Sequence, residues 1–241
     1  MPEVTATLLT RDGRVCDVIR TPLHRSHRLL ALAAVATIAL AACGDDTANT
    51  PAAGGTGAAT CAPADGSAPK TTQFTAGPPM CLVDGKTYVV TMETNQGTLH
   101  INMRADIAPQ TVNSFVNLAR FHYFDGTTCH RAIAGFVVQC GDPTASGTGG
   151  PGYEFADELD KIEPYQIGSV AMANSGPNTN GSQFFIITGP SGAALPAKYT
   201  LFGQVDPADM GVVTALDQLG NPQDGPPLQP INIDKVTVAE K

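Results

Sequence analysis

Short runs of β-type residues, separated by turn signals, fill the chain from Thr87 to its end and constrain its fold more than any other feature. We expect eight strands, near residues 87–94, 98–103, 128–133, 136–140, 168–173, 183–188, 201–205 and 231–238. Asn95-Gln96-Gly97 predicts a tight hairpin connection between the first two strands.

Helical periodicity is confined to two segments. The first opens with Pro109 and carries apolar residues along one helix face, at Val112, Phe115, Val116 and Ala119. The second runs from about Met210 to Leu219, with Gly220 as its C-cap. Eight short strands and two helices within residues 82–241 predict a mainly β fold, a closed eight-stranded antiparallel barrel with two capping α-helices.

Composition limits what such a domain can do. The 241 residues include 14 Lys and Arg against 22 Asp and Glu, which gives a formal charge of −8. A nucleic-acid-binding protein needs a basic face to replace counterions, so we expect no nucleic-acid partner. Beyond residue 42 the histidines are His100, His122 and His130, and neither HExxH nor paired CxxC spacing occurs. We therefore expect no metal and no cofactor.

Residues 1–42 have the order of a secretory signal peptide. Arg20, Arg25 and Arg28 precede an uncharged, mostly apolar run over residues 29–42. At about 1.5 Å per residue, a helix over this run would reach about 21 Å, short of the roughly 30 Å hydrocarbon core of a bilayer. A permanent membrane-spanning helix is therefore the weaker interpretation.

The apolar run ends in Leu40-Ala41-Ala42-Cys43-Gly44, which resembles the lipobox of bacterial lipoproteins. The resemblance implies cleavage before Cys43 and acylation of its thiol, in preference to a buried cysteine after a short helix. We therefore expect an exported protein that is anchored by lipid to the outer face of a bacterial cell membrane.

Residues 43–81 are mostly Ala, Gly, Thr and Pro, and Phe74 and Met80 are their only large apolar side chains before Cys81. Such a segment buries too little surface to offset its ordering entropy. The composition predicts a flexible tether over residues 43–81 that holds a folded domain, residues 82–241, away from the membrane.

Two segments carry chemistry-bearing residues within β context. Residues 129–142 read CHRAIAGFVVQCGD and residues 172–185 read MANSGPNTNGSQFF. A two-residue turn at Ala134-Gly135 would pair residue 130 with 139 and residue 129 with 140. This pairing would place Arg131 beside an amide side chain and the apolar Phe136, a combination that suits a prolyl peptide bond. Rotation about that bond has a barrier of about 18–20 kcal/mol, which a catalyst lowers by binding the twisted state.

Both segments closely resemble the cyclophilin family of peptidyl-prolyl isomerases, whose patterns are F-H-R-x-I-x-G-F-x-x-Q-x-G-D and M-A-N-x-G-P-N-T-N-G-S-Q-F-F. The resemblance implies catalysis by Arg131 with Phe136 and Gln139, and a supporting role for His130. The alternative interpretation of His130 is a histidine that is held by local hydrogen bonds. It also implies a substrate groove formed by Val137, Ala173, Asn174, Ser175, Gln183, Phe185, Leu195 and Tyr199. Ala194 stands where many members carry Trp.

The implied activity is prolyl isomerisation during the folding of exported proteins, by a monomer whose partners are proline-containing polypeptides. The alternative is a peptide-binding chaperone that uses the same groove without significant turnover.

The remaining cysteines form an even set, Cys61, Cys81, Cys129 and Cys140. Export would place them where disulfides persist. We expect Cys129 to bond Cys140 across the hairpin and Cys61 to bond Cys81, the alternative being four reduced thiols.

Overall fold

The computed structural model describes residues 56–57 and 60–241. The predicted signal peptide and Cys43 lie outside the described residues. Within the described part of the chain, every helix is too short or too polar to cross a membrane.

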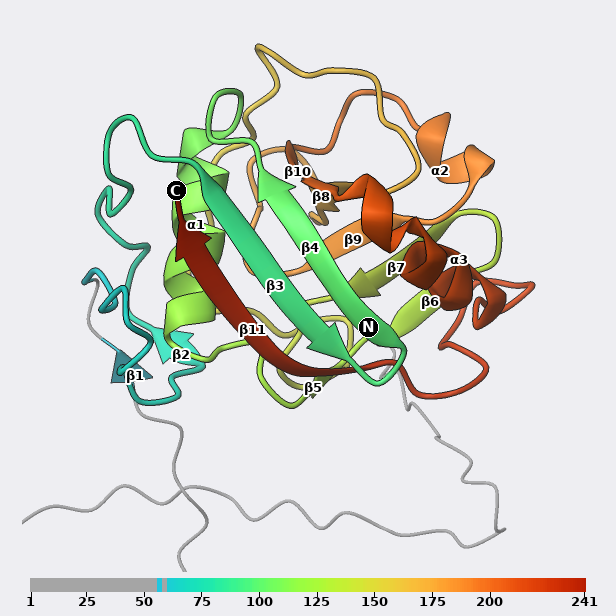
Figure 1. Cartoon of the computed structure of the whole chain (residues 1–241), viewed down its shortest axis with the longest axis horizontal. Helices are drawn as coiled ribbons and strands as arrows, with labels where there is room; N and C mark the ends of the chain where they lie inside the picture. The colour runs from blue at the N-terminus through green and yellow to red at the C-terminus, as the bar shows by residue number, and fades with distance from the viewer. Residues whose placement is uncertain (1–55, 58–59) are drawn as a thin grey trace, which may run out of the picture. The chain divides into compact units, whose positions relative to one another are not determined.

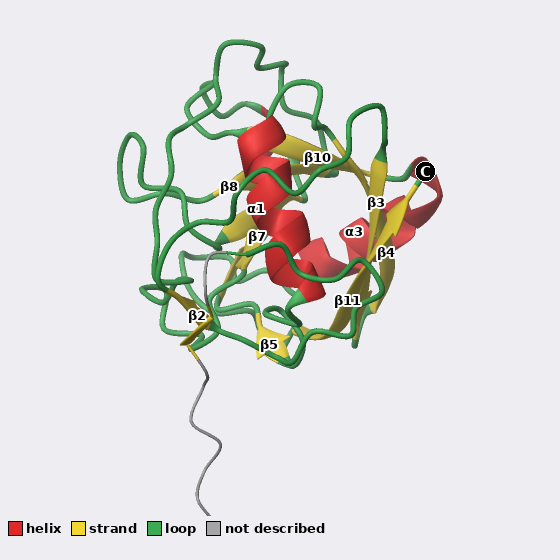
Figure 2. Ribbon diagram, turned by 90° about the vertical axis from the view of Figure 1, so that its left-hand side faces the viewer, coloured by secondary structure: helices red, strands yellow, loops and turns green. Residues whose placement is uncertain are grey.

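A curled antiparallel sheet forms the body of the domain, in the strand order β5-β11-β3-β4-β10-β8-β9-β7-β6 (Figure 1). Its strands are β3 (Tyr88–Thr94), β4 (Gly97–Met103), β5 (Thr127–Thr128), β6 (Arg131–Ile133), β7 (Val137–Cys140), β8 (Ser169–Met172), β9 (Phe184–Ile187), β10 (Leu201–Val205) and β11 (Asn232–Glu240). The helices are α1 (Pro109–Arg120), α2 (Pro190–Ala193), the 3-10 turn η1 (Pro207–Asp209) and α3 (Met210–Gln218). The strands ring the interior, and α1 and α3 cover its two ends (Figure 2).

The mainly β prediction is confirmed, but the sheet has nine strands rather than eight. The predicted strand over residues 128–133 is interrupted at Cys129-His130, so that β5 pairs with β11 and β6 pairs with β7. Within residues 60–241 no strand pairing joins β5 to β6, the two ends of this sheet. The closed eight-stranded barrel is therefore corrected to a curled nine-stranded sheet.

Aromatic packing explains why α1 lies over one end of the sheet. Phe115 of α1 stacks on Phe124 with ring centroids 4.6 Å apart and meets Phe184 and Phe202 at 5.4 and 5.2 Å. Pro109 opens the helix, and the Glu158 carboxylate accepts hydrogen bonds from its free N–H groups at 2.8 and 3.0 Å.

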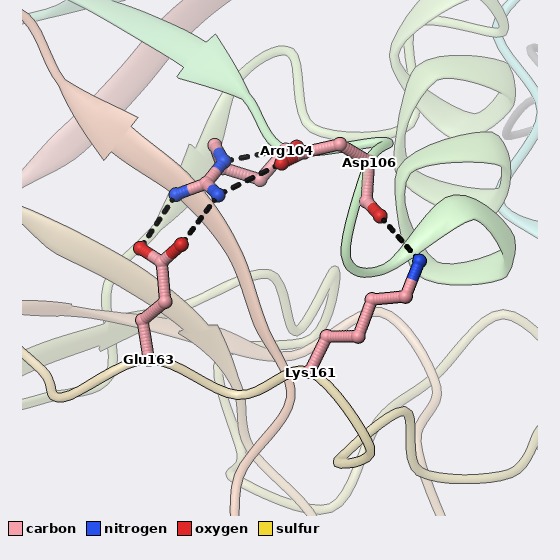
Figure 3. Close-up of polar contacts among 4 residues, drawn as sticks. All are labelled: Arg104, Asp106, Lys161 and Glu163. Atoms are coloured by element: carbon pink, nitrogen blue, oxygen red, sulfur yellow. Dashed lines mark hydrogen bonds and ion pairs between the residues drawn. The ribbon is translucent and has the colours of Figure 1, made fainter.

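A cluster of charged residues fixes the long segment that leads into β8. Arg104, just after β4, donates to both carboxylate oxygens of Glu163 at 2.8 and 2.9 Å and also pairs with Asp106 (Figure 3). Lys161 donates to the Asp106 carbonyl oxygen at 3.4 Å. These bonds hold residues 161–163 beside the end of β4.

The hairpin that carries Arg131 has a different register from the one predicted. Arg131 pairs with Gln139 and Ile133 with Val137, so the turn has three residues rather than two and the pairing of residue 130 with 139 is wrong. Gly135 adopts a left-handed φ of 70° in this turn, which suits a three-residue connection. Its N–H donates to the Asp217 carboxylate of α3 at 2.8 Å.

Residues 60–81, which we call the N-terminal strap, differ from the predicted flexible tether. They pack against the domain, with Ala62, Ala68 and Phe74 buried. β2 (Gln73–Phe74) pairs with β1 (Thr56–Gly57) in a small parallel sheet. The disulfides join Cys61 to Cys81 and Cys129 to Cys140, the pairings expected from the sequence, with Cα–Cα distances of 5.5 and 4.1 Å.

Candidate active site

The side chains that surround Arg131 form one row across four neighbouring strands. Arg131 pairs with Gln139, Gln139 with Phe185, and Phe185 with Ala171. Because side chains alternate between the two faces of a strand, these residues share a face. The residues between them, such as Val138 and Phe184, face the main core instead. Strand alternation therefore separates a site face from a core face on the same strands.

The row forms one side of a cavity of about 230 Å³. Its floor is apolar, since Val137 and Phe185 are almost fully buried, and Phe185 meets Tyr199 edge to face with centroids 5.4 Å apart. The lining residues are Arg131, Phe136, Val137, Gln139, Ala173, Asn174, Phe185, Leu195 and Tyr199. The structure thus brings together nine of the residues that the sequence assigned to the site.

Arg131 is held by an ion pair that was not predicted from the sequence. Its Nε and Nη2 donate to the two carboxylate oxygens of Asp224 at 2.6 and 2.9 Å, and its Nη1 donates to Gln139 Oε1 at 3.3 Å. Its guanidinium carbon also lies 5.8 Å from the centroid of the Phe136 ring. The hydrogen bonds with Asp224 raise the pKa of Arg131 and lower the pKa of Asp224. Arg131 is therefore a fixed, permanently charged donor.

Asp224 reaches this place because its loop covers the free edge of β6. The N–H of Ala132 donates to the Gly225 carbonyl at 3.0 Å, and the Asn221 N–H donates back to the Ala132 carbonyl at 2.9 Å. The Asn221 carbonyl accepts from the N–H of Ala134, just after β6, at 3.0 Å. Asp224 is also the only charged residue between positions 218 and 233. That isolated charge in a Pro- and Gly-rich loop is the signal that could have identified it.

A second cavity, of about 800 Å³, adjoins the first and shares Gln139, Ala173 and Asn174 with it. The predicted groove residues Ser175 and Gln183 line this second cavity. The Gln139 amide donates to Gln183 Oε1 at 2.9 Å, so the two cavities share a hydrogen-bonded wall.

The loop over residues 144–150 closes this wall because it folds around Asp142. Asp142 accepts bonds from the N–H groups of Thr144, Ser146, Gly147 and Gly149. Burial alone would raise the pKa of Asp142, but the hydrogen bond from the Thr144 hydroxyl, together with those from the N–H groups of Thr144, Gly147 and Gly149, outweighs it and holds the pKa well below its ordinary value. Gln183 in turn donates to the carbonyls of Gly147 and Gly149 at 3.0 Å. Asp142 belongs to the sequence motif, but its role in organising this loop was not predicted from the sequence.

His130 lines neither cavity. Burial lowers its pKa, so the neutral imidazole is favoured at neutral pH, and its buried Nδ1 makes no hydrogen bond within the described structure. The position suits a supporting role rather than contact with a substrate.

Within residues 60–241, no cluster of three His, Cys, Asp or Glu side chains has the arrangement of a metal site. The chemistry available at the cavity is that of a fixed cation, two amide side chains and an apolar floor. Such a site can bind and polarise a neutral amide without a nucleophile.

The domain is thus a curled antiparallel sheet that carries a cavity suited to a neutral amide. Residues 89–238 match the family described as cyclophilin type peptidyl-prolyl cis-trans isomerase, and the chain belongs to that family. The resemblance seen in the two sequence motifs is confirmed.

Relatives and solved structures agree with this assignment. Peptidyl-prolyl cis-trans isomerase B of Streptomyces anulatus is 42% identical over 169 residues, which cover 61% of this chain and 94% of the relative. The probable peptidyl-prolyl cis-trans isomerase B of Mycobacterium tuberculosis is 42% identical over 168 residues, and the chain spans about half of its length, 53%. A cyclophilin type isomerase of Cryptosporidium parvum has a TM-score of 0.59 at 30% identity, covering 64% of this chain and 99% of that one. The structure of the same protein in the presence of the dipeptide Ala-Pro has a TM-score of 0.58.

Proposed function

We propose that this chain is a peptidyl-prolyl cis-trans isomerase that acts on proline-containing polypeptides. One observation carries the proposal: Arg131, Gln139 and Phe185 lie in a single row beside an apolar cavity of about 230 Å³. Ligand pockets commonly hold about 300–1,000 Å³, so this cavity suits one small ring rather than a whole ligand. The name and contents of the Cryptosporidium parvum structure with Ala-Pro support the same substrate class.

Catalysis would follow from binding the twisted amide better than either planar isomer. Twisting removes resonance from the C–N bond and leaves a lone pair on the prolyl nitrogen. A guanidinium has five N–H donors, and Asp224 and Gln139 accept three of those on Arg131. The remaining two, one on Nη1 and one on Nη2, are available for the prolyl carbonyl and the developing lone pair. Because Asp224 already holds the guanidinium, little reorganisation is needed.

The groove residues would hold the rest of the peptide. Phe136, Val137, Phe185, Leu195 and Tyr199 would surround the proline ring, while Ala173, Asn174, Ser175 and Gln183 would line the path of the residues that precede it. Gln139 would orient Arg131 through its 3.3 Å bond and contact the peptide carbonyl.

The test is the rate of cis-trans exchange of a prolyl peptide, measured by a protease-coupled assay. We expect Arg131→Ala to lower kcat/KM by roughly a hundredfold to a thousandfold, the usual effect of removing one preorganised donor. Arg131→Lys keeps the charge but loses the forked geometry, so its rate should lie between the two. Wild-type protein that binds prolyl peptides without accelerating exchange would instead be a peptide-binding chaperone.

We also propose that the protein is exported, anchored through lipid at Cys43, and active as a monomer. The support for the anchor is the order of charged, apolar and Cys residues before Gly44. The two disulfides support an oxidising compartment, where such bonds persist.

A further inference from the structure

The N-terminal strap precedes the residues that match the family, 89–238, and is therefore an addition to the family domain. Its two ends are fastened to α1 by a pair of asparagines one helical turn apart. Asn117 accepts from the Ala62 N–H at 2.7 Å and donates to Thr60, while Asn113 accepts from the Cys81 N–H at 2.7 Å and donates to Pro79. Both asparagines are nearly fully buried. The Cys61–Cys81 disulfide closes the strap between these two attachment points.

The middle of the strap reaches the wall of the 800 Å³ cavity. Phe74 is buried, with its ring 5.2 Å from that of Phe121 and 6.4 Å from that of Tyr153. Its N–H donates to the Pro151 carbonyl at 2.8 Å. Gly152 has a left-handed φ of 95°, and a Cβ there would lie 2.4 Å from the Phe74 carbonyl oxygen. The strap and residues 151–153 therefore fit closely together.

Gln73 brings a side chain from the strap into the lining of this cavity. Its Nε2 donates to the Gly150 carbonyl at 2.9 Å. A carbonyl only accepts, so this bond fixes the amide orientation and leaves Oε1 as an acceptor. Glu154, which carries two acceptor oxygens, also lines this cavity. This part of the wall therefore offers acceptors to a bound peptide.

We infer that the strap is a specificity element of the proposed isomerase: through Gln73 it selects peptides that carry a hydrogen-bond-donating side chain shortly before the proline. The inference rests on the proposed function, because the larger cavity adjoins the proline cavity through Gln139, Ala173 and Asn174. A peptide whose proline occupies the smaller cavity would therefore place the residues that precede it at the larger one. The strap affects which peptide binds, and the proline cavity carries the catalysis.

The experiment compares kcat/KM for two peptides that differ only at the second residue before proline, glutamine or leucine. These side chains are similar in size and differ in their capacity to donate a hydrogen bond. We expect wild-type protein to prefer the glutamine peptide by about three- to tenfold, the range of one net hydrogen bond. Gln73→Ala should reduce that preference and leave kcat/KM for the leucine peptide unchanged. Thr75→Ala, an exposed strap position outside the cavity lining, is the matched control.

A second variant tests the strap as a whole. Replacing both Cys61 and Cys81 by Ser removes the disulfide that joins the two ends of the strap. We expect this variant to have a smaller preference for the glutamine peptide and still to turn over the leucine peptide. Equal kcat/KM for the two peptides in wild-type protein, or an unchanged preference in Gln73→Ala, would overturn the inference and leave the isomerase proposal standing. Failure of wild-type protein to turn over either peptide would instead refute the proposed function.

Discussion

Replacing Asp224 by Ala should weaken catalysis while leaving the substrate cavities intact. Asp224 does not line either cavity, and it acts through the two hydrogen bonds that hold the Arg131 guanidinium. Without them, Arg131 keeps its charge but samples more rotamers, and fewer of these direct its donors at the prolyl amide. Asp224 is therefore a positioning residue.

The exposure of the pair sets the size of the effect. The Asp224 side chain is 66% exposed and that of Arg131 is 30% exposed, so solvent screens much of the attraction. Exposed ion pairs contribute about 0.2–1 kcal/mol, and the forked geometry here favours the upper end. Since about 1.4 kcal/mol corresponds to a tenfold change in rate, we expect kcat/KM to fall about fivefold. Asp224→Asn retains one acceptor and should lie between wild type and Asp224→Ala.

The pH dependence separates positioning from a general loss of structure. Hydrogen bonding to Arg131 lowers the pKa of Asp224, so the ion pair is complete at neutral pH and is lost as the pH falls through that lowered value. The ratio of wild-type to Asp224→Ala activity should therefore be about five at neutral pH and approach one in acid. Exchange spectroscopy by NMR measures this ratio without a coupling protease.

Asp234→Asn removes one negative charge from an exposed position on β11 and serves as the control for net charge. It should match wild type at every pH. An Asp224→Ala protein with full activity at neutral pH, or a ratio that stays constant on acidification, would refute the positioning argument. Higher activity in Asp224→Ala would show that the ion pair restrains Arg131 instead of presenting it.

Three further predictions concern inhibition, anchoring and redox state. Cyclosporin-sensitive relatives present Trp where this chain has Ala194, so Ala194→Trp should raise cyclosporin affinity at least tenfold in a direct binding titration, and an unchanged affinity would contradict this. Cys43→Ser should leave the protein unacylated and release it from membranes washed with salt, whereas mass spectrometry of an unmodified Cys43 in native protein would exclude the anchor. Thiol titration of freshly isolated protein should find Cys129 and Cys140 oxidised, and two reactive thiols there would contradict the expected bond.

The strands could be predicted from the sequence because their signal is local. Alternation of side chains and turn residues placed β3, β4 and β10 within a residue or two of their observed bounds. The segment over residues 128–133 failed because its two halves pair with different partners, β11 and β7. Partner choice depends on the curl of the whole sheet, which a six-residue pattern does not contain. The hairpin register failed for a related reason, since Asp217 of α3 helps to fix the turn at Gly135.

The strap shows where a compositional argument falls short. Residues 60–81 carry few large apolar side chains, so burial alone predicts a flexible segment. These residues are held by the Cys61–Cys81 disulfide, which contributes about 3 kcal/mol on the chain-entropy model. The burial of Phe74 and the hydrogen bonds with Asn113 and Asn117 add to this. Those asparagines lie on a helix more than thirty residues away, and no property of the strap's own sequence reveals them.

The residues of the candidate site could be predicted from the sequence because they belong to two continuous motifs. The residues that position those side chains could not be predicted. Arg131 is fixed from the loop before β11 by Asp224, and Gln139 is linked through Gln183 to the loop that Asp142 organises. Each of these partners comes from a different part of the chain and meets the motif only after folding. Gln183 bonds both Gln139 and the wall that the strap supports, so a change there should disturb both proline turnover and discrimination of the preceding residue. Gln73 lines only the larger cavity and bonds Gly150 rather than Gln139, so it is placed to affect discrimination alone.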